Sequence, residues 1–224
     1  GDKFGKSFTC QINKPSAGTT PADNIYTFEG GKIADWELSN SVDGFLMLKA
    51  TCDFEKETIG AGAGAYAKQT FTSIANNAPF SYRGASITFN GTGVKAKDIS
   101  IKVSQGLDTE RFFIANGGNK YEPLQSERPN IEVELKAEYE SNALASTSAA
   151  TLAASKIVPV VATWNAPSAE TAGGTASLVI TFSYLRVDDV TNALGANGLI
   201  EQTIKGVAMG QSPMTAALNT PEAS

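Results

Sequence analysis

The sequence predicts a mainly β protein: a single sandwich-like or barrel-like domain with one short helix and long loops. Three observations lead to this class. Apolar and polar residues alternate with a period of two in several segments. Clusters of glycine, proline, asparagine and serine separate those segments. Only one segment, 141–156, has the alanine-rich composition of a helix, with Ser141 or Asn142 as its N-cap.

The expected strands follow one another along the chain. The Asn90–Gly91 pair between alternating arms is a strong signal for a tight hairpin. The Gly30–Gly31 pair predicts another turn between two extended arms. The remaining strands are expected at 7–12, 46–54, 131–140, 157–164, 176–187 and 198–208.

The domain is expected to span residues 1–224, with two long loops and a loose end. The first loop covers about 55–79 and holds a short strand near 65–71; the second covers 105–130 and holds the strand "RFFIA". A loop of that length in a compact domain is usually functional or mobile. Residues 209–224 are expected to form a flexible C-terminal tail.

Composition narrows the function classes. The net charge of −5 and the pI of about 4.9 do not favour electrostatic binding of a polyanion. The chain has no histidine, which removes Ser-His-Asp and Cys-His catalysis and most catalytic zinc sites. No run approaches the roughly 18 apolar residues of a membrane span, so no membrane partner is expected. The chain opens with Gly1 rather than Met, which indicates a processed product or part of a longer one.

Few motifs suggest a catalytic, cofactor or metal site. "GAGAGAY" at 60–66 lacks the Lys-Ser/Thr of a phosphate loop, and Asp188–Asp189 has no third carboxylate at EF-hand spacing. Cys10 and Cys52 fit no metal-ligand spacing and are expected to be small buried hydrophobes. We therefore expect no cofactor, no metal and no enzymatic activity, although a carboxylate pair among 23 acids stays open.

The segment "NIEVELKAEYES" at 130–141 carries the strongest remaining signal. Its apolar residues fall on one side of a strand, and four of the five residues on the other side are glutamates. One interpretation is an edge strand whose charges block aggregation. The other is a surface that repels something negative.

Three stretches resemble the tail tube proteins of long-tailed bacteriophages. They are "FEGGKIADWELSNSVDGFLMLKATCDFE", then "PFSYRGASITFNGTGVKAKDISIKVSQGLDTERFFIANGGNKYEPLQSERPNIEVELKAEYES", and finally "LVITFSYLRVDDV" with "GLIEQTIKGVAM". The resemblance covers most of residues 7–208. It consists of turn and alternation patterns, not of a catalytic signature.

The resemblance implies a structural virion protein whose copies form hexameric rings. The rings would stack into a hollow tail tube, assembled in the bacterial host cytoplasm, through which phage DNA is ejected without specific binding. Further partners would be the tape measure, terminator and distal tail proteins. A related ring protein at a tail end or at the capsid connector would share this fold.

Because the lumen of this family tends to be acidic, the resemblance suggests candidate lumen-facing acids. They are Glu132, Glu134, Glu138 and Glu140 on the strand 131–140, with Asp98 on the rival segment 93–104.

Two other function classes stay open. One is a β-sandwich carbohydrate-binding or adhesion module, which usually displays exposed aromatic residues or a calcium site. The other is a hydrolase that works through paired carboxylates. A stable monomer with glycan affinity would favour the first, and turnover of a substrate would favour the second.

Overall fold

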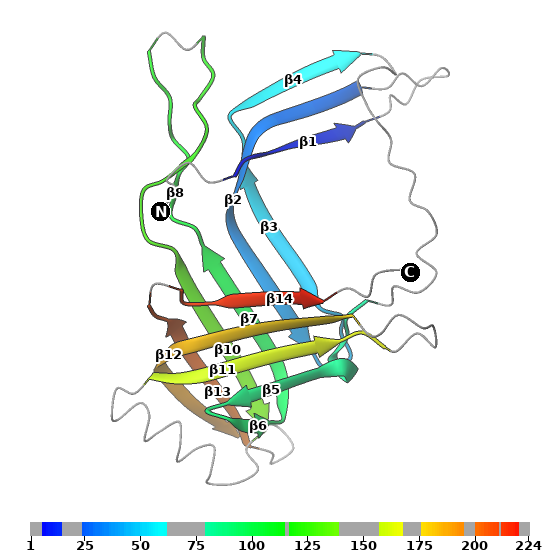
Figure 1. The fold of residues 1–224 in the computed structure, drawn as a ribbon, viewed down its shortest axis with the longest axis vertical. Coiled ribbons are helices and arrows are strands. Elements are labelled where there is room, and N and C mark those ends of the chain that lie inside the picture. Colours follow the sequence, from blue (N-terminus) through cyan, green and yellow to red (C-terminus); the bar gives the residue numbers. More distant parts are fainter. Residues whose placement is uncertain are drawn as a thin grey trace. The chain divides into compact units, whose positions relative to one another are not determined.

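The computed structural model describes residues 6–14, 24–61, 79–114, 117–138, 157–167, 176–194, 200–210 and 212–219. Most of these residues are in strands, and the described part of the chain contains no α-helix, only the 3-10 turn η1 (Tyr82–Gly84) (Figure 1). The predicted mainly β class is therefore confirmed. The helix expected at 141–156 lies outside the described residues.

The chain forms two compact units. Unit 1 contains residues 1–36, 50–74 and 104–129, and unit 2 contains residues 37–49, 75–103 and 130–224. The long strand β2 (Asn24–Ser41) and the strand β3 (Met47–Asp53) contribute residues to both units. A division of this kind does not distinguish one domain from two, so the single domain stays a prediction.

In unit 1, β2 lies between two antiparallel partners. Strand β1 (Phe8–Asn13) pairs with one edge of β2, and β4 (Lys56–Ala61) pairs with the other. Phe54 packs against Phe8 and Phe28, with ring centroids 5.5 and 5.2 Å apart. The long loop that the sequence predicted at about 55–79 thus begins with a strand, since β4 covers Lys56–Ala61.

The Gly30–Gly31 pair does not form the turn that the sequence predicted. It lies inside the continuous strand β2, where Gly30 has a φ of +63°. A Cβ at Gly30 would lie 2.7 Å from Cβ of Glu55, and a Cβ at Gly31 would lie 2.4 Å from a ring carbon of Phe54. The two glycines thus permit a close approach and a local kink within one strand, because they lack a side chain.

Unit 2 has two layers of strands that cross each other (Figure 1). One layer has the order β2, β7 (Ala96–Ser104), β10 (Asn130–Glu138), β13 (Ile200–Ala208) and the second half of β12 (Ser177–Leu194). The other has the first half of β12, β11 (Ile157–Asn165), β5 (Ala85–Phe89) and β6 (Thr92–Val94).

Strand β12 belongs to both layers. It pairs with β11 from Ser177 to Arg186 and with β13 from Leu185 to Leu194. The register of the pairing with β13 shifts between Val187 and Asp189. Such a β-bulge bends a strand, and here it changes the direction of β12. This one bent strand turns the two layers into a sandwich-like arrangement.

The core of unit 2 lies between these layers and is made by the inward residues of both. Its largest fully buried apolar side chains are Trp164, Phe89, Phe182, Ile101, Leu185, Ile204 and Val160. The indole Nε1 of Trp164 donates a hydrogen bond to Oδ1 of the buried Asn40, 3.0 Å away. Burying the polar edge of a tryptophan requires such a partner.

The predicted Asn90–Gly91 hairpin is confirmed. Phe89 pairs with Thr92, and Asn90 and Gly91 have φ values of +49° and +77°. Two successive positive φ angles are those of a type I′ turn, which matches the right-handed twist of the flanking strands.

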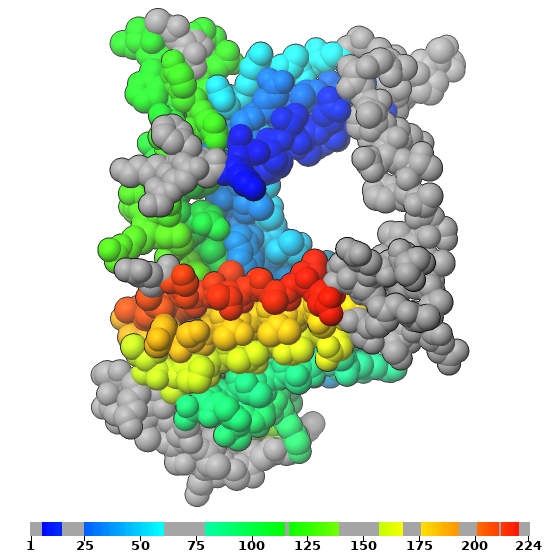
Figure 2. All heavy atoms as spheres, viewed as in Figure 1, coloured from blue at the N-terminus to red at the C-terminus, as the bar shows by residue number. Residues whose placement is uncertain are grey.

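Two other segments differ from the sequence-based expectation. Within the predicted tail 209–224, residues Thr215–Asn219 form β14, which pairs with the first half of β12; Figure 2 shows β14 in red along it.

Within the predicted loop 105–130, β8 (Leu107–Asp108) pairs with β9 (Leu124–Gln125), and Phe112 forms an isolated bridge with Lys120. The region holds a hairpin, and the described residues 111–114 of "RFFIA" form no strand beyond that bridge.

Candidate functional site: a charged sheet face

The outward side chains of five neighbouring strands in unit 2 form one surface, which we call the charged face. The strands lie in the order β2, β7, β10, β13 and β12. Their inward side chains are buried in the core, whereas polar and charged groups alternate with them on the other side. Among the described residues, the acidic members are Glu37, Asp98, Glu132, Glu134, Glu138, Asp188, Asp189 and Glu201.

The strand β10 explains why the charges point outward. Ile131, Val133, Leu135 and Ala137 have exposed fractions of 5%, 4%, 3% and 0%. Burial of these four residues holds the register, because a slip by one residue would turn every glutamate into the core. The alternation that the sequence predicted for residues 131–138 is confirmed.

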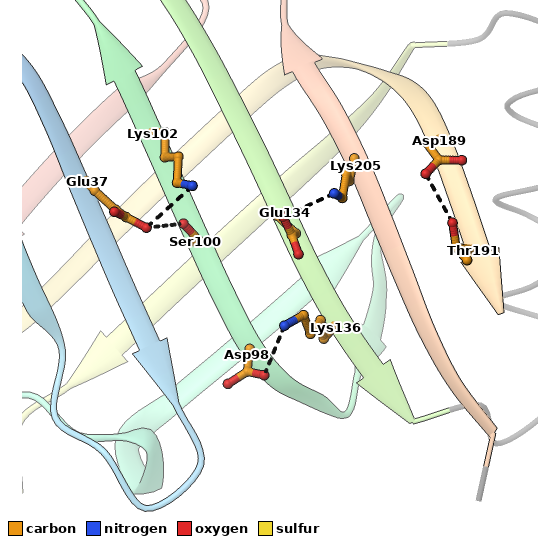
Figure 3. A network of polar contacts seen from close by, with 9 residues as sticks. All are labelled: Glu37, Asp98, Ser100, Lys102, Glu134, Lys136, Asp189, Thr191 and Lys205. Atoms are coloured by element: carbon orange, nitrogen blue, oxygen red, sulfur yellow. Dashed lines mark hydrogen bonds and ion pairs between the residues drawn. The ribbon is translucent and has the colours of Figure 1, made fainter. Parts of the chain in front are cut away.

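Lysines lie between the acids, so the face is not a bare acidic surface. On the neighbouring strand β13, Nζ of Lys205 lies 3.6 Å from a carboxylate oxygen of Glu134. Nζ of Lys136 lies 4.0 Å from a carboxylate oxygen of Asp98 on β7 (Figure 3). These cross-strand contacts reduce the repulsion that successive glutamates would otherwise exert within the sheet.

A third contact joins β2 to β7. The hydroxyl of Ser100 donates a 2.8 Å hydrogen bond to Oε1 of Glu37, and Nζ of Lys102 lies 3.9 Å from the same oxygen (Figure 3). The side chains in these ion pairs are about one third to three fifths exposed. Exposed pairs of this kind contribute only about 0.2–1 kcal/mol each, so their main effect is on the charge pattern.

Lys97 and Glu201 form a short ion pair, with Nζ and Oε1 2.6 Å apart. The hydrogen bond to Glu201 raises the pKa of Lys97 above its ordinary value. The reciprocal hydrogen bond from Lys97 lowers the pKa of Glu201. Both shifts favour the charged forms, so the pair stays ionised around neutral pH.

The charges do not cancel. Eight carboxylates are set against the ammonium groups of Lys97, Lys102, Lys136 and Lys205 and the guanidinium of Arg186. Among the described residues of this face, an excess of three negative charges therefore remains. A polyanion close to this face would be repelled weakly, with a range set by the Debye length of about 8 Å at physiological salt.

The structure brings most of the candidate acids together. Glu132, Glu134 and Glu138 point outward from β10, and Asp98 lies beside them on the neighbouring strand. The strand 131–140 and the segment 93–104 were rival candidates for the lumen wall, and their described acids lie on one face. Glu140 lies outside the described residues.

Apart from Asp98, sequence reasoning missed the acids of the strands that lie beside β10, and it missed their lysines. A usable signal was present in "KDISIKVS", where Asp98, Ser100 and Lys102 alternate with buried Ile99 and Ile101. A similar pattern in β13 alternates Glu201, Thr203 and Lys205 with buried residues. Neither pattern says which strand lies beside β10, since strand neighbours are set by the tertiary fold.

A hollow of about 340 Å³ lies on the charged face, over β7, β10, β13 and β12. Its lining is polar and charged apart from Val133, Gly206 and Val207, and none of its lining residues is aromatic. The surface thus lacks the flat aromatic side chains on which sugar rings stack. Its groups do suit a layer of ordered water, because nearly every one of them accepts or donates hydrogen bonds.

Within the described ranges, no group of three or more Cys, Asp or Glu residues is placed to hold a metal ion. Cys10 and Cys52 are free thiols, and both are half-buried, not buried as the sequence had suggested. No helix in the described part of the chain is long and apolar enough to cross a membrane.

No known protein family matches the chain, and no curated protein matches it. The resemblance to tail tube proteins thus depends on the sequence stretches quoted above and stays a prediction.

Proposed function

We propose that the chain is a structural subunit of a bacteriophage tail tube. In this proposal copies form rings, rings stack into a hollow tube, and the charged face of each copy lines the bore. The observation that carries it is the single sheet face with excess negative charge, opposite an apolar core. The tape measure, terminator and distal tail proteins would be its partners in the virion tail.

The charge balance of this face suits a wall past which DNA moves. Double-stranded DNA carries about one negative charge per 1.7 Å of its axis. A basic wall would bind it by releasing counterions, and each neutralised phosphate would slow its passage. A wall with a small acidic excess leaves the DNA hydrated and unbound.

The interleaved lysines have a role in the same proposal. Glutamates at alternate positions of one strand are about 7 Å apart, and those on adjacent strands are closer. Repeated around a ring, unrelieved repulsion would oppose closure. Lys102, Lys136 and Lys205 relieve it locally while the net charge stays negative.

Electron microscopy of the purified chain over a concentration series tests the assembly. Hollow rings or tubes are expected. Monomers at every concentration, together with affinity for a glycan panel, would favour the carbohydrate-binding alternative.

Thiol accessibility tests which face lines the bore. Thr203→Cys, on the charged face, is made in a chain that carries Cys10→Ser and Cys52→Ser. In assembled tubes the new thiol should react with a small maleimide but not with a bulky polyethylene-glycol maleimide. Unassembled chains, the matched control, should react with both. Reaction of assembled tubes with the bulky reagent would place the face outside the bore.

A further inference from the structure

The strand β14 lies at one edge of the second layer of unit 2. That layer runs in the order β6, β5, β11, the first half of β12 and then β14. Among the described strands, β12 is the only one that pairs with β14. One row of backbone N–H and C=O groups of β14 therefore points away from the sheet, where another extended chain can pair with it.

The strand β14 lacks the features that protect sheet edges. Proteins usually protect an edge by a short strand, a bulge, a lysine or a proline. Among the other described edge strands, β6, β8 and β9 have three residues or fewer, and β1 has a register shift between Phe8 and Cys10. The strands β3 and β4 contain Lys49 and Lys56. In contrast, β14 has five residues with no charge and no proline, and its pairing with β12 has no register shift.

The sheet surface that β14 borders is also uncharged. We call it the uncharged face: the outward side chains of β5, β11, β14 and residues 177–182 of β12. None of these outward residues is charged. One row across the face is Thr88, Val161, Thr181 and Thr215. Figure 2 shows the four strands as adjacent bands, from green (β5) through lime and yellow to red (β14). Depletion of charge is typical of the centre of a protein interface.

The sequence of β14 is complementary to itself in an antiparallel pair. When the pair is centred on Ala217, that residue lies opposite the same residue of a second copy. Leu218, which is 63% exposed, then lies opposite the small Ala216, and Thr215 lies opposite Asn219. Each large apolar side chain thus has a small neighbour, each hydroxyl has an amide neighbour, and no like charges meet.

We propose that β14 of one copy pairs with β14 of a second copy, antiparallel and about a two-fold axis at Ala217. The uncharged faces of the two copies then form one continuous sheet surface. Five residues a side make a small contact, so the dimer is reversible. A two-fold contact does not relate copies that all point the same way along a tube. The dimer therefore belongs to the unassembled chain, and it does not rest on the proposed function.

Cysteine pairing at the two-fold axis tests this contact. Ala217→Cys is made in a chain that carries Cys10→Ser and Cys52→Ser, and unassembled chains are oxidised mildly. Directly opposite Cα atoms of an antiparallel pair are about 4.5–5.5 Å apart, which is within the span of a disulfide. Residue 217 is exposed, so folding should be retained. A disulfide-linked dimer is expected.

Thr215→Cys, in the same background, is the matched control, since this residue is exposed and lies on the same side of β14. In the proposed register the two copies of residue 215 are about 13 Å apart, because each lies opposite residue 219 of the other copy. That distance is too long for a disulfide, so the linked dimer should be lost. Equal yields from Ala217→Cys and Thr215→Cys would overturn the proposal.

A mixture of two variants tests the register independently. Thr215→Cys is mixed with Asn219→Cys, in the same background and with a tag that changes its mobility. These positions lie opposite each other in the proposed pair, so a linked tagged–untagged dimer should return. Its absence would overturn the antiparallel register. No dimer from any of these variants would overturn the proposal and leave the edge of β14 to an extended segment of another protein.

Discussion

Replacing Asn40 by alanine should destabilise unit 2 out of proportion to the size of the change. Asn40 is 7% exposed, and its Oδ1 is the acceptor for Nε1 of Trp164, which is 1% exposed. Without that acceptor the indole N–H stays buried with no partner, at a cost of about 1–3 kcal/mol. Nδ2 of Asn40 also donates to the carbonyl of Gly44 at 3.3 Å, so the turn after β2 loses a contact too. We expect a total loss of about 2–3 kcal/mol in the free energy of unfolding.

The assay is urea denaturation followed by far-UV circular dichroism. Ser39→Ala, one residue away and half-buried, is the matched control and should change stability by no more than about 0.5 kcal/mol. Trp164→Phe removes the donor instead of the acceptor. The double variant should be more stable than additive losses predict, with a coupling energy of about 1–2 kcal/mol. A loss for Asn40→Ala as small as that of the control, or a coupling energy near zero, would refute the reasoning.

Three further predictions follow from the same structure. Leu135→Ala empties a position that is 3% exposed and should cost about 2–5 kcal/mol in urea denaturation; a loss below about 1 kcal/mol would mean that the β10 core is loosely packed. Gly30→Ala should cost at least about 1–2 kcal/mol, because its φ of +63° strains an alanine and the new Cβ would also lie 2.7 Å from Cβ of Glu55. Gly93→Ala, with open space around it, should be nearly neutral, and equal effects would contradict the reasoning about Gly30. Because Lys97 lowers the pKa of Glu201, the stability advantage of the wild type over Glu201→Gln should hold at neutral pH and decline as the pH falls through that lowered pKa. Urea denaturation at a series of pH values checks this, and an advantage that grows on acidification would contradict it.

Several local features were predictable because neighbouring residues decide them. Asn90–Gly91 forms its hairpin because both residues tolerate a positive φ. The glutamates of β10 face outward because the apolar residues between them must be buried. In both places the relevant energies act within a few residues of the chain.

The predictions that differ from the structure involve partners distant in sequence. Gly30–Gly31 was expected in a turn, but pairing with β1 and β4 on both edges keeps β2 extended. Residues 215–219 have no buried side chain and were expected to be loose, yet β12 offers them a strand edge. Backbone pairing of this kind leaves little trace in side-chain pattern.

The sequence by itself determined that the chain is mainly β, that β10 has one apolar and one acidic side, and that histidine chemistry is absent. The tertiary structure alone decided that Asp98 lies beside Lys136 and that Lys205 lies beside Glu134. The physical reason is that alternation along a strand is a local property, whereas the neighbours of a strand depend on long-range hydrogen-bonded pairing. That pairing places the lysines of neighbouring strands beside a strand whose outward side carries mostly glutamates, and a small negative excess remains.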